Sequence, residues 1–323
     1  MIFALALTGP TASGKTALSL EIADRLGCEI ISCDSMQIYR DMNIGTAKAT
    51  EDERARVPHH LVDFLSLSES FSAEDYRALA VKAAKDISAR GKIPLFVGGT
   101  GLYIDTVMRG VSEAPPSSEE YRKKLLDLAS SEEGASALYD RLVRVDPESA
   151  SAIHRNNVKR VIGALEIYDL TGKPKSYFDK RSLSAVSEVK VKMITLDFHE
   201  RDNLYRRVDE RVDVMMSEGL LSEVRELYSS GLLKKDTTAA AAIGYKEIIS
   251  HLDGEITLDE AVELIKLSSR RYAKRQLTWF RHETDAYRMY LDNEDGTMKN
   301  KDELISEAVN IASQITKECR EHV

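Results

Sequence analysis

One short segment near the start of the chain constrains the possible folds more than any other feature. Residues 9–16 read GPTASGKT and match the pattern G-x-x-x-x-G-K-[ST] at every fixed position. The segment follows an almost wholly apolar run, Ile2–Thr8, and leads into Lys15–Leu26, where leucine and isoleucine recur every four residues. A buried strand, a glycine loop and a helix in this order are typical of a phosphate-binding loop. The sequence therefore predicts a parallel α/β core.

The residue types in this loop have physical roles. Backbone N–H groups of the loop and of the helix N-terminus surround an anion, and glycine allows the backbone to approach it closely. The lysine adds positive charge beside the phosphate oxygens, and the hydroxyl of Thr16 can ligate Mg²⁺ held by the same phosphates. We therefore predict that a polyphosphate group is bound by Gly9, Pro10, Thr11, Ala12, Ser13, Gly14, Lys15 and Thr16.

Further strands and helices follow in the alternation expected of a parallel sheet. Apolar runs at Glu29–Cys33 and Ile93–Val97 predict two strands. Between them, Ser72–Gly91 has a capping serine and a glycine stop, which predict a helix. The alternating run Val189–Phe198 predicts a strand that returns to the sheet. The expected fold class is α/β, with a P-loop NTPase-like parallel sheet flanked by helices.

A mostly helical insertion is expected within this core. Residues 120–192 show a helical pattern and no strong strand. They carry 14 lysines and arginines against 11 aspartates and glutamates, a net charge of +3 in a chain whose net charge is −8. We predict a catalytic core formed by residues 1–115 and 190–323, with a helical C-terminal part, and a helical insertion over residues 116–189.

Composition excludes several classes of protein. The 323 residues are 43% hydrophobic and 30% charged, which is typical of a folded chain. The net charge of −8 excludes a uniformly basic nucleic-acid coat, although a local basic patch is compatible with it. No apolar run approaches the roughly 20 residues of a membrane span, and the three cysteines lack metal-ligand spacing. We expect a cytoplasmic protein with no membrane partner.

Two polar residues follow predicted strands at the edge where open α/β sheets bind their ligands. Asp34 comes directly after the second strand and Thr100 follows the third. Three interpretations of Asp34 remain open at this point, namely a general base, a Mg²⁺ ligand and a helix cap. Thr100 could cap a helix over Gly101–Arg109, face the site, or do both. The metal-holding residues usual for nucleotide hydrolysis are incomplete here.

Seven stretches together resemble one enzyme family, the tRNA dimethylallyltransferases, also called tRNA isopentenyltransferases. The DSMQIYR and GGTGLY blocks within them are more specific than the phosphate-binding loop. The absence of a Cys₂His₂ finger after Trp279 suggests the bacterial type. The matching stretches are GPTASGKT (9–16), ISCDSMQIYRDMNIGTAK (31–48), PHHLVD (58–63), FVGGTGLY (96–103), VKRVIGALEIY (158–168), AAIGYKE (241–247) and AKRQLTWFRH (273–282).

The resemblance implies a reaction and roles for three residues. The dimethylallyl group of dimethylallyl diphosphate is transferred to N6 of adenosine at tRNA position 37, beside the anticodon, and diphosphate leaves. The loop at residues 9–16 then holds an allylic diphosphate with Mg²⁺, and no ATP is consumed. Asp34 would accept the proton of N6, Thr100 would lie on the substrate side, and Arg211 would neutralise diphosphate charge.

The resemblance also implies a tRNA-binding surface. Ser268–His282 contains five lysines and arginines and no acidic residue, with Trp279 and Phe280 interleaved, which suits phosphates and splayed bases. The helical insertion would grip the anticodon stem, and a monomer is expected. Gly163 stands where many family members have arginine, so one contact could be missing. The tRNA-binding residues expected are Asp34, Ser35, Met36, Gln37, Thr100, Arg122, Lys159, Arg160, Gly244, Tyr245, Lys274, Arg275, Gln276, Leu277, Thr278, Trp279, Phe280 and Arg281.

Three alternatives share parts of this pattern. An isopentenyltransferase acting on free adenine nucleotides has the same core but needs no large RNA-binding insertion. An ATP-dependent P-loop kinase has no use for the basic and aromatic segment at 270–281. A noncatalytic RNA-binding protein would not need Lys15, Thr16, Asp34 and Thr100 together.

Overall fold

The chain divides into two compact units. A computed structural model describes residues 1–109, 118–184 and 187–321. The first unit comprises Met1–Met108 and Glu188–Val323, and the second comprises Arg109–Ser187. The boundary expected between residues 115 and 116 lies outside the described residues. Within those residues, no helix is both long and apolar enough to cross a membrane.

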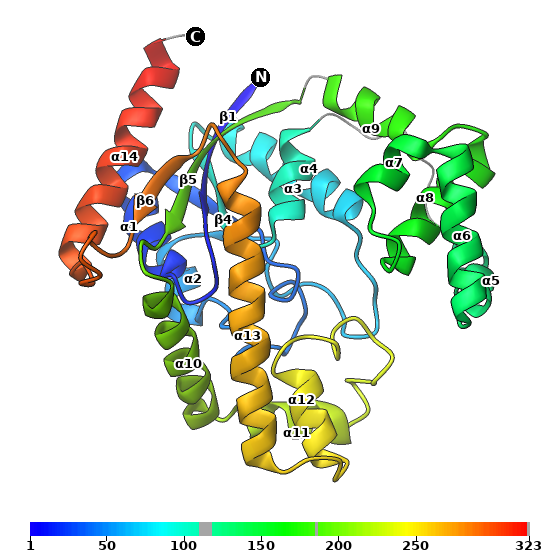
Figure 1. Cartoon of the computed structure of the whole chain (residues 1–323). Helices are drawn as coiled ribbons and strands as arrows, with labels where there is room; N and C mark the ends of the chain where they lie inside the picture. The colour runs from blue at the N-terminus through cyan, green and yellow to red at the C-terminus, as the bar shows by residue number, and fades with distance from the viewer. Residues whose placement is uncertain (110–117, 185–186, 322–323) are drawn as a thin grey trace. The chain divides into compact units, whose positions relative to one another are not determined.

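The first unit is built on a parallel sheet, which confirms the predicted fold class (Figure 1). Within the described residues the sheet has six strands in the order β3-β2-β4-β1-β5-β6, and every neighbouring pair is parallel. The two short strands β3 and β6 were not predicted, because two to four residues leave no periodic signal. The strands are β1 (Ile2–Thr8), β2 (Cys28–Ser32), β3 (His59–His60), β4 (Ile93–Gly98), β5 (Val189–Asp197) and β6 (Tyr287–Tyr290).

Alternate side chains of β1 enter two different cores. Leu5 and Leu7 pack with helices α1 (Lys15–Leu26) and α14 (Lys301–Glu321). Ala4 and Ala6 pack on the opposite face with α3 (Ala73–Ala89) and α4 (Gly101–Met108). This period of two buries both faces of the strand, as the almost wholly apolar sequence of β1 requires.

A third core lies beyond the carboxyl ends of the strands, where a helical layer packs on the segment 36–67. Helix α13 runs beside α10 and contacts α12, and α11 contacts α12 (Figure 1). The short helix α2 (Glu51–Arg56) lies within the same stretch of chain as this segment. The layer consists of α10 (Arg201–Glu218), α11 (Leu220–Ser229), α12 (Tyr245–Leu252) and α13 (Leu258–Arg281).

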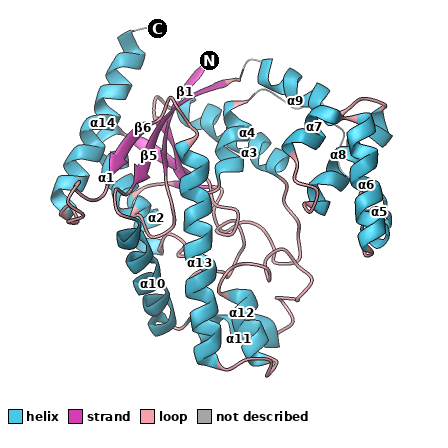
Figure 2. Ribbon diagram, viewed as in Figure 1, coloured by secondary structure: helices cyan, strands magenta, loops and turns pink. Residues whose placement is uncertain are grey.

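Helices are the regular secondary structure of the second unit within its described residues (Figure 2). It has a core of its own, in which Leu138 and Leu142 of α6 pack on Val161 and Leu165 of α8. Both pairs are spaced by four residues, so each presents one apolar stripe to the other helix. The helices are α5 (Glu119–Leu128), α6 (Glu132–Val145), α7 (Pro147–Ala152), α8 (Val158–Thr171) and α9 (Lys175–Ser184).

Candidate active site

The phosphate-binding loop opens onto a cavity of about 410 Å³ in the first unit. Thr11–Thr16 line the cavity, together with Asp34 and part of α10 and α13. Gly14 has φ of +82° and ends the loop as the N-cap of α1, a conformation that glycine adopts without strain. The N-terminus of α1 therefore belongs to the wall of the cavity, as an anion site requires.

Two side chains of the loop are available to bind an anion. Lys15 Nζ donates to the carbonyl oxygens of Gly9 at 3.0 Å and Pro10 at 2.6 Å. Burial lowers the pKa of Lys15 to about 7, with the charge of Arg211 adding to the effect. Ser13 Oγ is buried and has no hydrogen-bond partner among the described residues. An ammonium group without a carboxylate partner and an unpartnered hydroxyl both suit a bound phosphate.

Helix α10 brings two arginines to the loop. Arg207 Nε donates to the carbonyl oxygen of Ala12 at 2.8 Å, and Arg211 lines the cavity. Burial lowers the pKa of Arg211. The two arginines are four residues apart and therefore share one face of the helix. Arg211 was predicted from the sequence and Arg207 was not, because the partner of Arg207 is a backbone carbonyl of a distant loop.

Asp34 and Thr100 meet where β2 and β4 end. The N–H of Thr100 donates to the carbonyl oxygen of Cys33 at 3.1 Å, and the N–H of Ser35 donates to Thr100 Oγ1 at 3.2 Å. Asp34 Oδ1 accepts from the N–H groups of Met36 at 2.8 Å and Gln37 at 3.3 Å, a cap-like arrangement. The other oxygen, Oδ2, accepts no hydrogen bond from the described residues. Asp34 lines the cavity, so one oxygen orients the carboxylate while the second stays available.

Gln37 lines the cavity, but its amide is already engaged. Nε2 donates to the carbonyl oxygens of Thr46 and Ala47, both at 3.1 Å, and Oε1 accepts from Ser32 Oγ at 3.4 Å. Both amide hydrogens are therefore used within the protein. Gln37 is predicted to contact tRNA, and its amide is already bonded to a loop of the cavity wall.

Apolar side chains form another part of the cavity wall. Val208 and Val212 of α10 lie one turn apart, and Met215, Leu220 and Ile265 continue the apolar surface. The cavity therefore has a cationic end at the phosphate-binding loop and an apolar wall beside it. An anion with a short hydrocarbon chain is the kind of ligand that such a cavity accommodates.

The predicted tRNA-binding segment of α13 divides between two faces of the helix. Lys274, Arg275, Thr278 and Trp279 are exposed, and Arg275 also lines the cavity and lies 5.6 Å from the centre of the Tyr272 ring. Burial raises the pKa of Tyr272 to about 12, with Asp34 adding to the effect. The exposed face of α13 therefore presents cationic side chains beside an aromatic ring.

Three members of the segment point inward. The predicted RNA contact of Leu277 and Phe280 is corrected, whereas Gln276 also lines the cavity and its contact stays a prediction. Leu277 and Phe280 are 6% and 1% exposed and pack in the cores on the two faces of the sheet. Gln276 is 6% exposed; its Oε1 accepts from the N–H of Thr11 at 2.8 Å and its Nε2 donates to the carbonyl oxygen of Gly99 at 2.9 Å. Helical periodicity assigns these side chains to the protein interior.

Two further residues that were predicted to contact tRNA interact with carboxylates of the protein instead. Arg281 donates to both carboxylate oxygens of buried Asp197, at 3.0 and 2.7 Å, so its guanidinium is committed to an ion pair. Tyr245 is 0% exposed, and its hydroxyl donates to Glu223 at 2.5 Å. Its predicted tRNA contact is corrected because the side chain is buried. Gly244 lines the cavity, and its contact with tRNA stays a prediction.

The predicted cations of the second unit differ in their surroundings. Arg122 Nε donates at 2.8 Å to Glu166, whose side chain is buried. The side chains of Lys159 and Arg160 are exposed and form no ion pair with the described residues. A Cβ added at Gly163, on the same helix, would meet nothing within 4 Å. The surface therefore leaves room for a Cβ at this position.

The cavity offers few protein ligands for a metal ion. No group of three or more histidine, cysteine, aspartate or glutamate side chains is close enough to hold one within the described residues. The hydroxyl of Thr16 and the carboxylate of Asp34 both line the cavity. This set fits Mg²⁺, which keeps several waters and binds through one or two protein oxygens plus substrate phosphates.

Comparisons with known proteins agree on one family. The model of the family described as IPP transferase matches residues 37–283. The tRNA dimethylallyltransferase of Geobacillus thermodenitrificans is 52% identical over 280 residues, which are 86% of this chain and 87% of that protein. The Bacillus subtilis tRNA dimethylallyltransferase is 47% identical over 277 residues, 85% of this chain and 87% of that protein.

Solved structures give the same result. The full-length tRNA isopentenylpyrophosphate transferase from Bacillus halodurans superposes with a TM-score of 0.72 at 43% identity, and the match covers 100% of both chains. A eukaryotic dimethylallyltransferase described as acting on tRNA has a TM-score of 0.77 at 31% identity, over 90% of this chain and 74% of that one. The resemblance seen in the sequence is confirmed, and the chain belongs to the IPP transferase family.

Proposed function

We propose that this protein is a tRNA dimethylallyltransferase that modifies N6 of the adenosine at tRNA position 37. The donor is dimethylallyl diphosphate, and diphosphate is released. The observation that carries the proposal is the cavity itself, because a cationic phosphate loop, an apolar wall and the carboxylate of Asp34 line a single space. Relatives named tRNA dimethylallyltransferase cover most of the chain.

The cationic end of the cavity prepares the leaving group. Lys15, Arg211 and the N–H groups at the start of α1 surround the diphosphate and stabilise the negative charge that grows as the C1–O bond breaks. The bonding electrons leave with the diphosphate. The apolar wall at Val208, Val212 and Ile265 holds the dimethylallyl chain and excludes water from C1. Mg²⁺ bound by Thr16 and the phosphates would supply further positive charge.

Asp34 prepares the acceptor. The N6 amine is a weak nucleophile that must lose a proton as it forms the new C1–N6 bond. The free Oδ2 of Asp34 accepts this proton, while Oδ1 is held by the N–H groups of Met36 and Gln37. Adenine stacked in an RNA loop cannot reach C1, so the base must be flipped into the cavity. The exposed face of α13 and the cations of the second unit would hold the flanking RNA.

The test is a transfer assay without ATP. Purified protein, Mg²⁺ and radiolabelled dimethylallyl diphosphate are mixed with unmodified tRNA or with AMP. We expect label in tRNA and none in AMP. Asp34→Ala should lower kcat by about 10²–10⁴-fold with tRNA affinity within a few-fold, whereas Asp86→Ala, an exposed aspartate of α3, should match the wild type. Label in AMP alone would assign the enzyme to free nucleotides, and label in neither would contradict prenyl transfer.

A further inference from the structure

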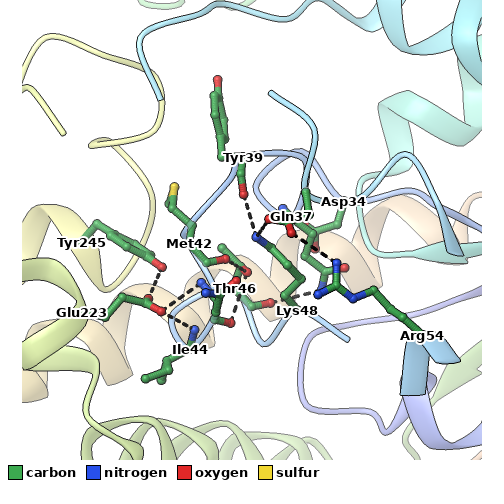
Figure 3. Close-up of polar contacts among 12 residues, drawn as sticks. Asp34, Gln37, Tyr39, Met42, Ile44, Thr46, Lys48, Arg54, Glu223 and Tyr245 are labelled. Atoms are coloured by element: carbon green, nitrogen blue, oxygen red, sulfur yellow. Dashed lines mark hydrogen bonds and ion pairs between the residues drawn. The ribbon is translucent and has the colours of Figure 1, made fainter. Parts of the chain in front are cut away.

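One wall of the cavity is a loop without regular secondary structure. Gly45, Thr46 and Ala47 line the cavity, and Ala47 has a φ of +44°. No helix or strand of the described residues includes this stretch, so its position depends on the side chains that hold it. Figure 3 shows those side chains arriving from two directions.

On one side, the carboxylate of Glu223 from α11 accepts hydrogen bonds from three consecutive N–H groups. Glu223 Oε2 accepts from Asn43 at 2.9 Å and Ile44 at 2.8 Å, and Oε1 accepts from Gly45 at 3.2 Å. The hydroxyl of Tyr245 adds a fourth bond to Oε1 at 2.5 Å (Figure 3). Hydrogen bonds to an ionised carboxylate are roughly twice as strong as neutral ones, so this group is a strong anchor for the loop.

Packing at Gly45 shows how tightly the loop is held. A Cβ at this position would come within 2.4 Å of the Tyr245 ring and 2.9 Å of Leu220 Cδ1. Glycine is therefore needed for the backbone to lie against the ring. The aromatic ring and the carboxylate together fix a single position of the loop against α11 and α12.

The opposite side of the loop leads to Asp34. The Gln37 amide donates to the carbonyl oxygens of Thr46 and Ala47, as described above, and the N–H of Gln37 donates to Asp34 Oδ1 at 3.3 Å. A continuous set of hydrogen bonds thus runs from Glu223 through the loop and Gln37 to Asp34. Lys48 fixes the far end of the loop, because Nζ donates to Asp63 at 2.6 Å.

We propose that Glu223 is a positioning residue that seats the loop 43–47 and, through Gln37, orients the carboxylate of Asp34 toward the acceptor. This inference rests on the proposed function. Glu223 itself is not among the residues that line the cavity, so it acts only through the loop. The phosphate-binding loop at residues 9–16 is held by other contacts, so binding of the diphosphate substrate should be largely independent of Glu223.

The variant Glu223→Gln tests the proposal. It keeps the size of the side chain but turns an acceptor oxygen into an NH₂ group that faces N–H donors. We expect kcat for tRNA to fall about 10–100-fold, as displacement of a reacting group by about 1 Å does, with KM for dimethylallyl diphosphate within about threefold. Glu226→Gln makes the same change on an exposed face of α11 and should match the wild type.

A double variant separates positioning from a purely structural role. If Glu223 acts through Asp34, Glu223→Gln should not lower kcat further in the Asp34→Ala background, because there is no carboxylate left to orient. An equal loss in both backgrounds, or a kcat for Glu223→Gln within twofold of the wild type, would overturn the inference. Absence of transfer by the wild-type enzyme would instead overturn the proposed function, and with it the reaction that Glu223 is inferred to support.

Tyr245→Phe keeps the inference testable if Glu223→Gln does not fold. It removes one hydrogen bond to Glu223 and leaves the ring against Gly45. Loss of a single hydrogen bond should change kcat by about fivefold, and this loss should also vanish in the Asp34→Ala background. Persistence of the loss in that background would contradict the proposal.

Discussion

The loop at residues 9–16 and the segment 270–281 of α13 were both identified from short sequence patterns. They differ in how many of their residues face the cavity. In the loop, Thr11–Thr16 line the cavity, and the carbonyl oxygens of Gly9 and Pro10 hold Lys15. In the helix, neighbouring residues of one motif point in different directions, some to solvent or the cavity and others into the core. A site made of backbone groups uses consecutive residues, whereas a helix offers a ligand only one residue in three or four.

The largest expected effect tests the loop. Lys15→Met keeps most of the side-chain volume and removes the positive charge beside the diphosphate. We expect kcat/KM for dimethylallyl diphosphate to fall by about 10²–10³-fold, in the range of an electrostatic group acting on a leaving group. Lys82→Met, at an exposed position of α3, is the control. A loss below threefold for Lys15→Met would remove the loop from the chemistry.

The second prediction separates two adjacent aromatic residues of the helix. Phe280→Ala should lower the free energy of unfolding by about 3–5 kcal/mol, because this ring is buried in the core. Trp279→Ala should lower stability less than Phe280→Ala, since Trp279 is 36% exposed, but should weaken tRNA binding by about 1–3 kcal/mol if a base stacks on it. Urea unfolding and filter binding measure the two quantities. The reverse pattern would mean that the faces of α13 are assigned wrongly.

Two arginines of the same helix provide a third contrast. Arg281→Ala leaves buried Asp197 without its main partner and should lower the free energy of unfolding by about 1–3 kcal/mol. Arg275→Ala should leave stability unchanged. It should reduce the slope of the logarithm of tRNA affinity against the logarithm of salt concentration by about 1, the value of one phosphate contact. Titrations of tRNA at several salt concentrations measure this slope. An unchanged slope for Arg275→Ala would exclude a phosphate contact by this residue.

The smallest expected effect is the pH dependence of dimethylallyl diphosphate binding, which arises from Lys15 of the loop. Since the pKa of Lys15 is about 7, the side chain is largely neutral above that pH and must take up a proton when the diphosphate binds. Affinity for dimethylallyl diphosphate should therefore fall as pH rises above 7, by at most about tenfold per pH unit. Lys15→Met reports the ionisation of the ligand alone. Parallel pH curves for both proteins would contradict the titration of Lys15.

The sequence was sufficient to predict the order of the long elements. The apolar run of β1, the helical spacing of α1 and the capping Ser72 of α3 are local signals, and each element formed where it was expected. A helical C-terminal part was also predicted, but the sequence was insufficient for the packing of its helices and for the side chains that turn inward. The pairing of Arg281 with Asp197, and the seating of residues 43–45 on Glu223, join residues 84 to about 180 positions apart. No local pattern specifies such contacts.

The residues of the site divide in the same way, into those that a local sequence pattern predicts and those that depend on contacts with distant residues. Lys15 and Asp34, which line the cavity, were predicted because one stands in a motif and the other directly follows a strand. Thr100 was predicted in the same way but is not among the residues that line the cavity. Arg207 and Glu223 were missed because their partners are backbone groups of distant loops. A charged side chain that serves a backbone group leaves no complementary side chain in the sequence to reveal it.

The central claim is that a single cavity brings the C1 atom of dimethylallyl diphosphate to the N6 amine of a flipped adenosine. Mass spectrometry of nuclease fragments from tRNA modified by the wild-type enzyme tests it most directly. We expect one dimethylallyl group, on N6 of the adenosine beside the anticodon, and at most about a hundredth of this amount in the same tRNA incubated with Asp34→Ala for the same short time. A dimethylallyl group on another atom or nucleotide, or equal modification by Asp34→Ala, would contradict it.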